Sequence, residues 1–426
     1  MKAANDQVSY AMIGTGGRGS YLLKHLTKVE NGRCVAVCDI DDEALNKAPQ
    51  VIGTNPRKFK DYREVLAQKN IDAVLIAVPL FAHFPVTRDA LLAGKHTFCE
   101  KSLVFKPEEV HALRALANER NKQVLQVGLQ RRYSKFYQTV RQMIDKGFLG
   151  KVTHVHAMWH RNPGWAMKPG GKGNPKNWRL FKEFSGGLTA ELASHQIDVA
   201  DWMFGATPEF VMGLGGIDFY NDGRDVFDNI QLIYNYPGNR KLMYSSITTN
   251  AHLPYLGSSR PEFGELIMGT EASVEITVGD GEATMPTALW YKENKKVTFG
   301  GPVPAEKKKE EAKQAGSTFA LGSGQRGLPL LMSKDEITGK ESFFEREMKF
   351  ARRWLYAKGI MMSDEDRNPV DVSLESFFND CRTGGKPKAN LEIGLADSTA
   401  VILSNLCMTE NRRVYFNEIE KMGKKA

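Results

Sequence analysis

The feature that most constrains the fold is an alternation of apolar and amphipathic segments over residues 8 to 127. Continuous short apolar runs predict β-strands, and the segments between them have the 3.6-residue spacing of helices. The expected strands are Val8–Ile13, Cys34–Cys38, Ala73–Val78, His96–Cys99 and Gln123–Val127. Because strands that are apolar throughout must be covered on both faces, the alternation predicts a doubly wound parallel sheet, the α/β Rossmann class.

The pattern changes after Gly128. Short runs of β-branched and aromatic residues then alternate with polar ones, and turns such as Pro237-Gly238-Asn239 join them, as in hairpins. We therefore expect a Rossmann domain over residues 1–128 and a C-terminal α+β domain over residues 129–426, with a mostly antiparallel open sheet. The segment Pro302–Gly327, rich in Lys, Glu, Gly and Ser, is expected to be a surface loop.

Composition and charge exclude several classes of partner. The 426 residues are 42% hydrophobic and 25% charged, as in ordinary globular proteins. The net charge of +8 is spread along the chain and is not interleaved with aromatic residues, so we expect no nucleic-acid partner. No apolar run approaches the ~20 residues that span a bilayer, so no membrane partner is expected. The chain as given shows no secretion leader before the first strand, which indicates the cytoplasm unless a leader was removed, so the compartment stays open.

A glycine-rich turn follows the first expected strand. Gly14-Thr15-Gly16-Gly17-Arg18-Gly19 fits the pattern G-x-G-x-x-G between a strand and a helix, the context in which it marks a dinucleotide site. Gly14 permits the tight turn, Gly16 lets the backbone approach a pyrophosphate, and Gly19 lets the helix pack closely on the strand. The helix that begins here directs free N–H groups at the phosphates.

Asp39 ends the second expected strand, about 20 residues beyond the last glycine. A carboxylate at this position binds the ribose diol of the adenosine. It repels a 2′-phosphate, and the nearby Asp41 adds to that effect, so we expect NAD in preference to NADP. The alternative is a tight glycine turn beside a solvated carboxylate, but the strand–turn–helix context favours the nucleotide.

Lys101 follows the fourth expected strand, in the run Cys99-Glu100-Lys101-Ser102. The ends of parallel strands border the ligand crevice of a doubly wound sheet, so Lys101 can meet both a nicotinamide ring and a substrate hydroxyl. Glu100 can hold the ammonium group in place or touch the cofactor. The alternative is a solvated surface pair, which is the better interpretation of Glu-Lys taken in isolation.

A second candidate cluster lies on a helix expected to end near Phe204. Glu191 and His195 are four residues apart and Asp198 is three further along, so an α-helix places all three on one face. A carboxylate oriented toward an imidazole is the usual arrangement of a general base. An exposed charge pair is the alternative. His154 and His156 share a strand face, but no further ligand has metal-site spacing, so no metal is expected.

A polar loop begins at His160 and runs to about Phe184. It contains Trp165 and the pair Trp178-Arg179. A pyranose has apolar C–H faces and a rim of hydroxyl groups, so aromatic rings beside Arg and His side chains suit it. The alternative is that the tryptophans anchor an otherwise mobile loop to the core.

Together these segments resemble the Gfo/Idh/MocA family, which includes glucose–fructose oxidoreductase and inositol dehydrogenase. The residues that carry the resemblance are Gly14–Gly19, Asp39, Pro79 and His83, Glu100-Lys101, Gln130-Arg131-Arg132, Gly186-Gly187, and Glu191, His195 and Asp198. The resemblance implies a Rossmann domain, an open-sheet C-terminal domain, and homodimers or homotetramers formed through the sheet. The chain departs from the family pattern at Ser102, where the family has proline, and at Glu191, where it has aspartate.

The resemblance also implies roles for single residues. Lys101 is expected to polarise the reacting hydroxyl, His195 to take its proton, and Glu191 to orient His195. The expected cofactor contacts beyond the glycine turn are Asp39, Pro79, His83, Glu100, Lys101 and Gln130. The expected substrate contacts are Lys101, Arg132, His160, Trp165, Trp178, Arg179, His195 and Asp198.

We therefore expect an NAD-dependent oxidoreductase that moves a hydride between nicotinamide and a carbinol carbon of a sugar or glycoside, with C3 as one candidate. A redox glycosidase is the first alternative, because Trp178-Arg179 also looks like a motif of the NAD-dependent glycosidases of this superfamily. A non-catalytic nucleotide or sugar sensor is the second, although both Lys101 and His195 are present. If a leader was removed, the resemblance allows periplasmic export by the twin-arginine route.

Overall fold

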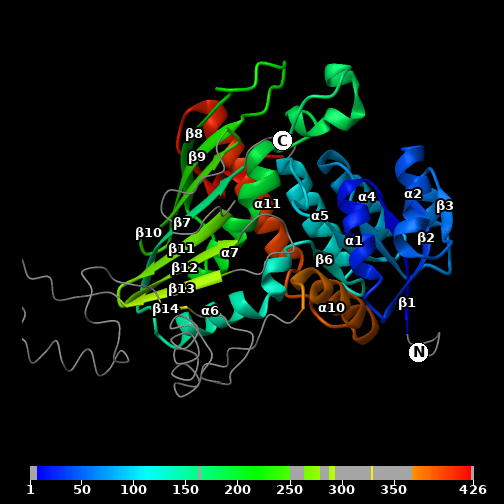
Figure 1. Ribbon diagram of the computed structural model, residues 1–426, viewed down its shortest axis with the longest axis horizontal. Helices are drawn as coiled ribbons and strands as arrows, with labels where there is room; N and C mark the ends of the chain where they lie inside the picture. Colours follow the sequence, from blue (N-terminus) through cyan, green and yellow to red (C-terminus); the bar gives the residue numbers. More distant parts are fainter. Residues whose placement is uncertain are drawn as a thin grey trace, which may run out of the picture.

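The computed structural model contains two sheets with helices around and between them (Figure 1). It describes residues 7–161, 165–249, 263–278, 287–292, 328–329 and 367–423. The expected surface loop Pro302–Gly327 lies outside these residues.

The first sheet has six parallel strands in the order β3-β2-β1-β4-β5-β6. Their order reverses between β1 and β4, and in doubly wound sheets the ligand crevice lies at this point, beyond the carboxyl ends of the strands. The strands are β1 (Val8–Ile13), β2 (Gly32–Cys38), β3 (Arg57–Phe59), β4 (Ala73–Ile76), β5 (His96–Cys99) and β6 (Leu125–Val127).

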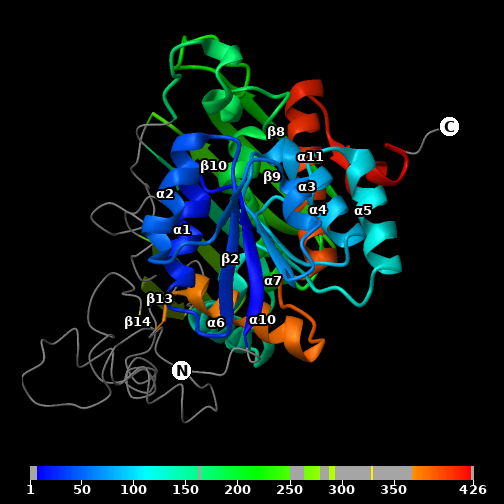
Figure 2. The same ribbon diagram turned by 90° about the vertical axis from the view of Figure 1, so that its right-hand side faces the viewer.

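Helices cover both faces of this sheet (Figure 2). Every residue of β1 and β4 is buried, which explains why these strands are apolar and lack the alternation of a half-exposed sheet. The prediction of a Rossmann fold is confirmed. On one face lie α1 (Gly17–Leu26) and α2 (Asp42–Ile52), and on the other lie α3 (Tyr62–Leu66), α4 (His83–Leu92) and α5 (Pro107–Glu119).

The second sheet has the order β14-β13-β12-β11-β7-β10-β9-β8-β15 and is antiparallel except for the β7–β10 pair. The predicted open, mostly antiparallel sheet is therefore confirmed. Two-residue edge strands leave no periodic pattern, so β14 and β15 were not expected. The strands are β7 (Val152–His160), β8 (Phe210–Gly216), β9 (Asn229–Tyr236), β10 (Arg240–Ile247), β11 (Phe263–Gly269), β12 (Ala272–Val278), β13 (Thr287–Lys292), β14 (Leu328–Pro329) and β15 (Val414–Tyr415).

The two faces of the second sheet differ. Along β9 buried and exposed side chains alternate, as a half-covered strand requires. Tyr234 faces α11 (Leu391–Glu410), where its hydroxyl lies 2.7 Å from Ser404 Oγ. Ile233 points the other way and is 40% exposed, and Leu214 on β8 is 65% exposed. One face of the sheet thus packs on helices while the other presents large apolar side chains.

The C-terminal part of the chain joins both layers. Helix α10 (Pro369–Thr383) packs on the first sheet beside α1, and the Phe378 ring stacks on Tyr10 with centroids 5.2 Å apart. Burying a phenylalanine in this way contributes about 1.5–3 kcal/mol. A segment assigned from the sequence to the second domain therefore covers the first sheet, so the division at residue 128 does not describe α10.

Helix α11 lies between the two sheets (Figure 1). It is 20 residues long, and an 18-residue window of it has a mean hydropathy of 1.3, so by length and composition it could cross a membrane, although the sequence analysis expected no such segment. However, 67% of it is buried inside the protein. A helix covered by a sheet on each side is apolar all round for that reason.

Candidate active site

A cleft of about 640 Å³ lies beyond the carboxyl ends of β1, β2, β4 and β5, a volume typical of small-molecule and cofactor sites. We call Gly14, Gly16, Gly17, Asp39 and Asp41 its nucleotide end. Its reaction end comprises Lys101, Trp159, Arg161, Trp165, Trp178, Arg179, Glu191 and His195, all of which line the same cavity.

The glycine turn leaves its backbone open to the cleft. Gly14 has a φ of +89°, and a Cβ there would lie 2.5 Å from the Ala77 carbonyl oxygen. A Cβ on Gly16 or Gly17 would meet nothing within 4 Å, so both positions leave room for a pyrophosphate at the start of α1. Gly19 does not line the cavity, because it packs against the Gly14 carbonyl, where a Cβ would approach within 1.9 Å.

Asp39 is held beside this turn by backbone groups. Its Oδ2 accepts a hydrogen bond from the Thr15 N–H at 2.7 Å, and its Oδ1 accepts one from the Asp41 N–H at 2.9 Å. Asp41 Oδ2 forms an ion pair with Lys176 Nζ at 3.1 Å, and Lys176 belongs to the part of the chain that follows β7. Open backbone N–H groups next to a fixed carboxylate fit a dinucleotide. The sequence analysis did not predict Lys176 as a site residue, because it is one of several charged residues in a polar loop and belongs to no motif.

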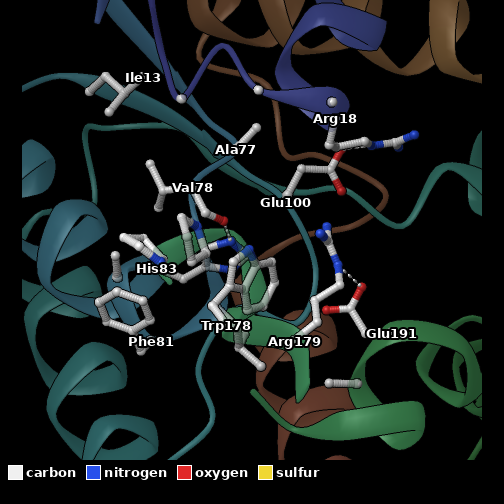
Figure 3. A pocket seen from close by; sticks show the side chains of 18 of the residues that line it. Ile13, Arg18, Ala77, Val78, Phe81, His83, Glu100, Trp178, Arg179 and Glu191 are labelled. Atoms are coloured by element: carbon white, nitrogen blue, oxygen red, sulfur yellow. Dashed lines mark hydrogen bonds and ion pairs between the residues drawn. The ribbon is translucent and has the colours of Figure 1, made fainter. Parts of the chain in front are cut away.

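His83 ties two loops of the cleft together (Figure 3). Its Nδ1 lies 2.7 Å from the Ser102 carbonyl oxygen and its Nε2 lies 3.0 Å from the Val78 carbonyl oxygen. Burial lowers the pKa of His83, but Cys99 and the two carbonyl groups outweigh burial and raise it to about 9. A charged ring that donates to both carbonyl groups fixes the backbone next to Lys101.

Lys101 lies against the π-helical turn Thr189–Ala193. Its Nζ donates to the carbonyl oxygens of Ala190 at 2.8 Å and Glu191 at 2.6 Å. Burial lowers the pKa of Lys101, and the nearby Glu191 carboxylate opposes that shift. The ammonium group is therefore held by backbone from the other half of the chain, in a position where it faces the cavity.

Two further carboxyl groups act on Lys101. Glu100 pairs with Arg18 at 2.8 Å, where the glycine turn meets the Lys101 segment (Figure 3). Asp397, on α11, is 1% exposed, and burial raises its pKa well above the usual value. Nothing in the sequence pattern pointed to Asp397, because α11 carries no recognisable motif and only its packing brings it here.

His195, in the first turn of α7 (Ser194–Phe204), also faces the cleft. Its ring centroid lies 5.8 Å from that of Trp159, and among the described residues its Nδ1 has no hydrogen-bond partner. Burial lowers the pKa of His195 well below 6.5, and the charges of Lys101, Arg131 and Arg18 lower it further. The imidazole is therefore uncharged at neutral pH, as a general base must be.

The structure pairs Glu191 with Arg179, and its expected role in orienting His195 stays a prediction. Its carboxylate binds Arg179 Nε at 3.0 Å (Figure 3). Although burial raises the pKa of Glu191, Arg179 and Lys101 outweigh it and lower that pKa. The prediction assumed α-helical spacing, but Thr189–Ala193 forms a π-helix. The extra residue in a π turn rotates Glu191 away from the face that carries His195.

Arg132 and Asp198 do not line the cavity, so the structure does not bring them together with the other predicted substrate contacts. They are buried and bind each other at 2.7 Å. Such a pair satisfies two charges that would be costly to bury alone. Gln130, two residues before Arg132, does not line the cavity either, so its role as a cofactor contact stays a prediction.

His160 also lies away from the cleft. Its Nε2 is 3.0 Å from Ser245 Oγ on the neighbouring strand. Side chains alternate along β7, so Trp159 and Arg161 face the cavity while His160 points to the opposite face of the sheet. The same alternation, applied to the sequence, would have selected Trp159 and Arg161 in place of His160.

The predicted aromatic residues lie together at the reaction end. The Arg179 guanidinium carbon is 4.3 Å from the centre of the Trp178 ring and 5.9 Å from that of Trp165. The Arg161 guanidinium carbon is 5.2 Å from the Trp165 ring. These rings and cations form an amphipathic wall of the kind that suits a sugar. Within the described ranges, no three His, Cys, Asp or Glu side chains form a metal-binding group.

Two family models match the chain. One describes an oxidoreductase family with an NAD-binding Rossmann fold, Gfo/Idh/MocA, and matches residues 8–129. The other describes the Gfo/Idh/MocA C-terminal domain and matches residues 137–275. The two matches follow one another in the order that the two sheets have along the chain.

Three curated relatives match part of the chain. An uncharacterised oxidoreductase of Synechocystis is 30% identical over 215 residues, 49% of this chain and 55% of that protein. An inositol 2-dehydrogenase/D-chiro-inositol 3-dehydrogenase of Lactiplantibacillus plantarum is 30% identical over 193 residues, 45% and 51% of the two chains. A glycosyl hydrolase family 109 protein of Shewanella is 31% identical over 173 residues, 38% and 37%. The chain spans about half or less of the length of these relatives.

Solved structures match over nearly the whole length. The aldose-aldose oxidoreductase from Caulobacter crescentus has a TM-score of 0.69 and 17% identity, covering 96% of this chain and 99% of that one. Levoglucosan dehydrogenase, in complex with NADH and levoglucosan, has a TM-score of 0.68 and 16% identity, covering 96% and 99%. At such identity these matches establish the fold.

Proposed function

Because the chain belongs to the Gfo/Idh/MocA oxidoreductase family, we propose that it is an NAD-dependent oxidoreductase that acts on a carbinol carbon of a sugar or glycoside. The observation that carries this proposal is that Lys101 and His195, from opposite halves of the chain, line one cavity with the glycine turn. An ammonium group, an uncharged imidazole and a dinucleotide cradle are the groups that oxidation of a hydroxyl requires.

In this proposal the glycine turn binds the pyrophosphate and Asp39 binds the adenosine ribose. Lys101 donates a hydrogen bond to the reacting hydroxyl and stabilises negative charge on its oxygen. His195 takes the hydroxyl proton, for which its low pKa leaves it free. When bound, NAD accepts the hydride that leaves the carbinol carbon as this carbon becomes a carbonyl. The reverse reaction returns the proton from His195 to the same oxygen.

We further propose that NAD is used in preference to NADP. The Asp39 carboxylate is fixed by the Thr15 and Asp41 N–H groups, and Asp41 adds a second negative charge next to it. A 2′-phosphate placed there would meet like charge, whereas a ribose hydroxyl would donate a hydrogen bond.

The exposed face of the second sheet supports a further part of the proposal, a homodimer or homotetramer formed through that sheet. Leu214, Met243 and Met212 are 65%, 44% and 41% exposed there, and contiguous exposed apolar surface of this kind marks interaction sites. Light scattering coupled to gel filtration measures the assembly, and a monomer at all concentrations would contradict this part.

One assay tests the proposed function. Purified protein is incubated with NAD and a panel of sugars, inositols and glycosides, and NADH absorbance is followed together with the products. We expect NADH and a keto sugar in equal amounts. Free sugar without net NADH would instead establish a redox glycosidase, the reading favoured by Trp178 and Arg179 at the reaction end. Tight NAD binding with no turnover of any substrate would establish a sensor.

A further inference from the structure

The reaction end carries more positive than negative charge. Three cations line it, Lys101, Arg161 and Arg179, against the single carboxylate of Glu191. Arg179 binds that carboxylate at 3.0 Å, and Lys101 is held by backbone carbonyl groups. His195 adds no charge, because burial and its cationic neighbours lower its pKa well below 6.5.

Arg161 is the cation that this arrangement leaves without a counter-charge. It follows β7 on the same face as Trp159, and its backbone N–H donates to the Ile247 carbonyl oxygen at 2.9 Å. Its guanidinium lies over the Trp165 ring at 5.2 Å. Among the described residues, no carboxylate pairs with this guanidinium.

The other carboxylates of the cleft cannot serve Arg161, because each has partners of its own. Asp39 accepts from two backbone N–H groups. The remaining three are each paired with a different cation, Asp41 with Lys176, Glu100 with Arg18 and Glu191 with Arg179. Within the described ranges, every carboxylate of the cleft thus has another partner, which leaves a ligand carboxylate free to pair with Arg161.

The oxidised nicotinamide ring carries a positive charge, which adds to the charge of the reaction end when the cofactor is bound. A neutral sugar would leave the charges of Arg161 and of the ring without a counter-charge from the substrate, in a cavity with apolar walls, where electrostatic interactions are strong. An anionic substrate supplies this counter-charge and is drawn in by the same field.

Building on the proposed function, we propose that the substrate is a sugar that carries a carboxylate, and that Arg161 binds this carboxylate. A guanidinium and a carboxylate match in plane and spacing and form two parallel hydrogen bonds. The Trp165 ring stacks on the flat face of the guanidinium and leaves its edge directed at the ligand. Lys101 and His195 then act on a hydroxyl of the same sugar.

The test compares sugars that differ only in the anionic group. Glucose is paired with glucuronate and galactose with galacturonate, and glucose 6-phosphate separates carboxylate from phosphate recognition. With NAD saturating, we expect kcat/KM to be about 10- to 100-fold higher for the acid of each pair, since a charge-assisted pair contributes about 1.5–3 kcal/mol.

The variant Arg161→Gln removes the charge and keeps a polar side chain of similar length. We expect KM for the sugar acid to rise about 10- to 100-fold, with a smaller effect on kcat, so that the preference for the acid over the neutral sugar disappears. Arg57→Gln is the matched control, because Arg57 stacks on Phe59 at 5.4 Å in the same manner but does not line the cavity. It should leave both constants unchanged.

The outcomes separate this inference from the function on which it rests. Turnover of neutral sugars as fast as of their acids, or an unchanged KM for the acid in Arg161→Gln, would overturn the carboxylate site and leave the oxidoreductase standing. A preference for glucose 6-phosphate would overturn the carboxylate as the recognised group. If no sugar is oxidised, the proposed function fails. In that case calorimetric binding of glucuronate to the NAD-loaded protein, lost in Arg161→Gln, would still support the site.

Discussion

The two ends of the cleft are built in different ways. At the nucleotide end, a contiguous glycine turn and Asp39 offer backbone N–H groups and a carboxylate, each fixed by near neighbours in the first sheet. At the reaction end, Lys101 is positioned by the carbonyl groups of Ala190 and Glu191, about ninety residues further along the chain. Binding of the nucleotide therefore depends on local geometry, whereas the chemistry depends on how the two layers pack.

The largest expected effect separates the two ends directly. Lys101→Met should lower kcat about a thousandfold, because it removes the group that stabilises charge on the reacting oxygen, and should leave NAD affinity nearly unchanged. Steady-state kinetics and NADH fluorescence titration measure the two quantities. Lys95→Met is the matched control, since Lys95 Nζ also donates to two backbone carbonyl groups but lies outside the cavity lining. Equal losses of kcat in the two variants would contradict a catalytic role for Lys101.

The pH dependence tests whether the buried charges act as described. The pKa of His195 is lowered well below 6.5, so the imidazole stays deprotonated as the pH falls to 6.5. The acidic limb of the pH profile of kcat/KM for oxidation should therefore lie below pH 6.5. The pKa of Lys101 is lowered from 10.5, so the alkaline limb should lie below that value. In Lys101→Met, loss of the neighbouring positive charge should raise the pKa of His195, which an NMR titration of its ring measures. An unchanged titration would show that the two groups do not interact.

A smaller effect is expected at the nucleotide end. Asp39→Ser removes the carboxylate but keeps a hydroxyl near the ribose, so KM for NAD should rise about tenfold and KM for NADP should fall. The value of kcat at saturating cofactor should change little, in contrast to Lys101→Met. If Asp39→Ser lowers kcat by the same factor by which it raises KM for NAD, the nucleotide end affects the chemical step as well as cofactor binding, and the contrast between the two ends is wrong.

The smallest effect concerns the ion pair that joins the layers at the nucleotide end. Lys176 and Asp41 are 50% and 36% exposed, so their attraction is screened by water and salt. Lys176→Ala should weaken NAD binding by less than about threefold at low salt and not at all at high salt. Lys172→Ala serves as control, because Lys172 pairs with Glu183 in the same loop and does not line the cavity.

The nucleotide end could be predicted from the sequence because its groups are contiguous and their context is local. Gly14, Gly16 and Asp39 lie where the strand–turn–helix pattern indicated. At the reaction end, Lys101 and His195 do line the predicted cleft, but the pairing of Glu191 with Arg179 could not be predicted, because a π turn leaves no signature in residue spacing.

Other features of the site arise from interactions between distant segments, which the sequence pattern does not show. Asp198 has the spacing of a catalytic acid, yet Arg132 neutralises it inside the core. His160 was chosen for its chemistry without regard to the alternation along β7, which turns it to the opposite face. Asp397 and helix α10 reach their places by packing alone, since neither carries a motif. Pairings of this kind depend on tertiary structure and cannot be read from one segment.

The position of helices α10 and α11 in the chain has a consequence for biosynthesis. The strands of the first sheet lie within residues 8–127. Helix α10, which covers this sheet, is complete only when residue 383 has been translated, and α11, which lies between the two sheets, only when residue 410 has been translated. A nascent chain therefore exposes Tyr10 and Phe98, which later pack on α10, for most of its synthesis. Because N-terminal segments emerge from the ribosome first, the nascent protein must keep this apolar surface from aggregating until its last helices arrive.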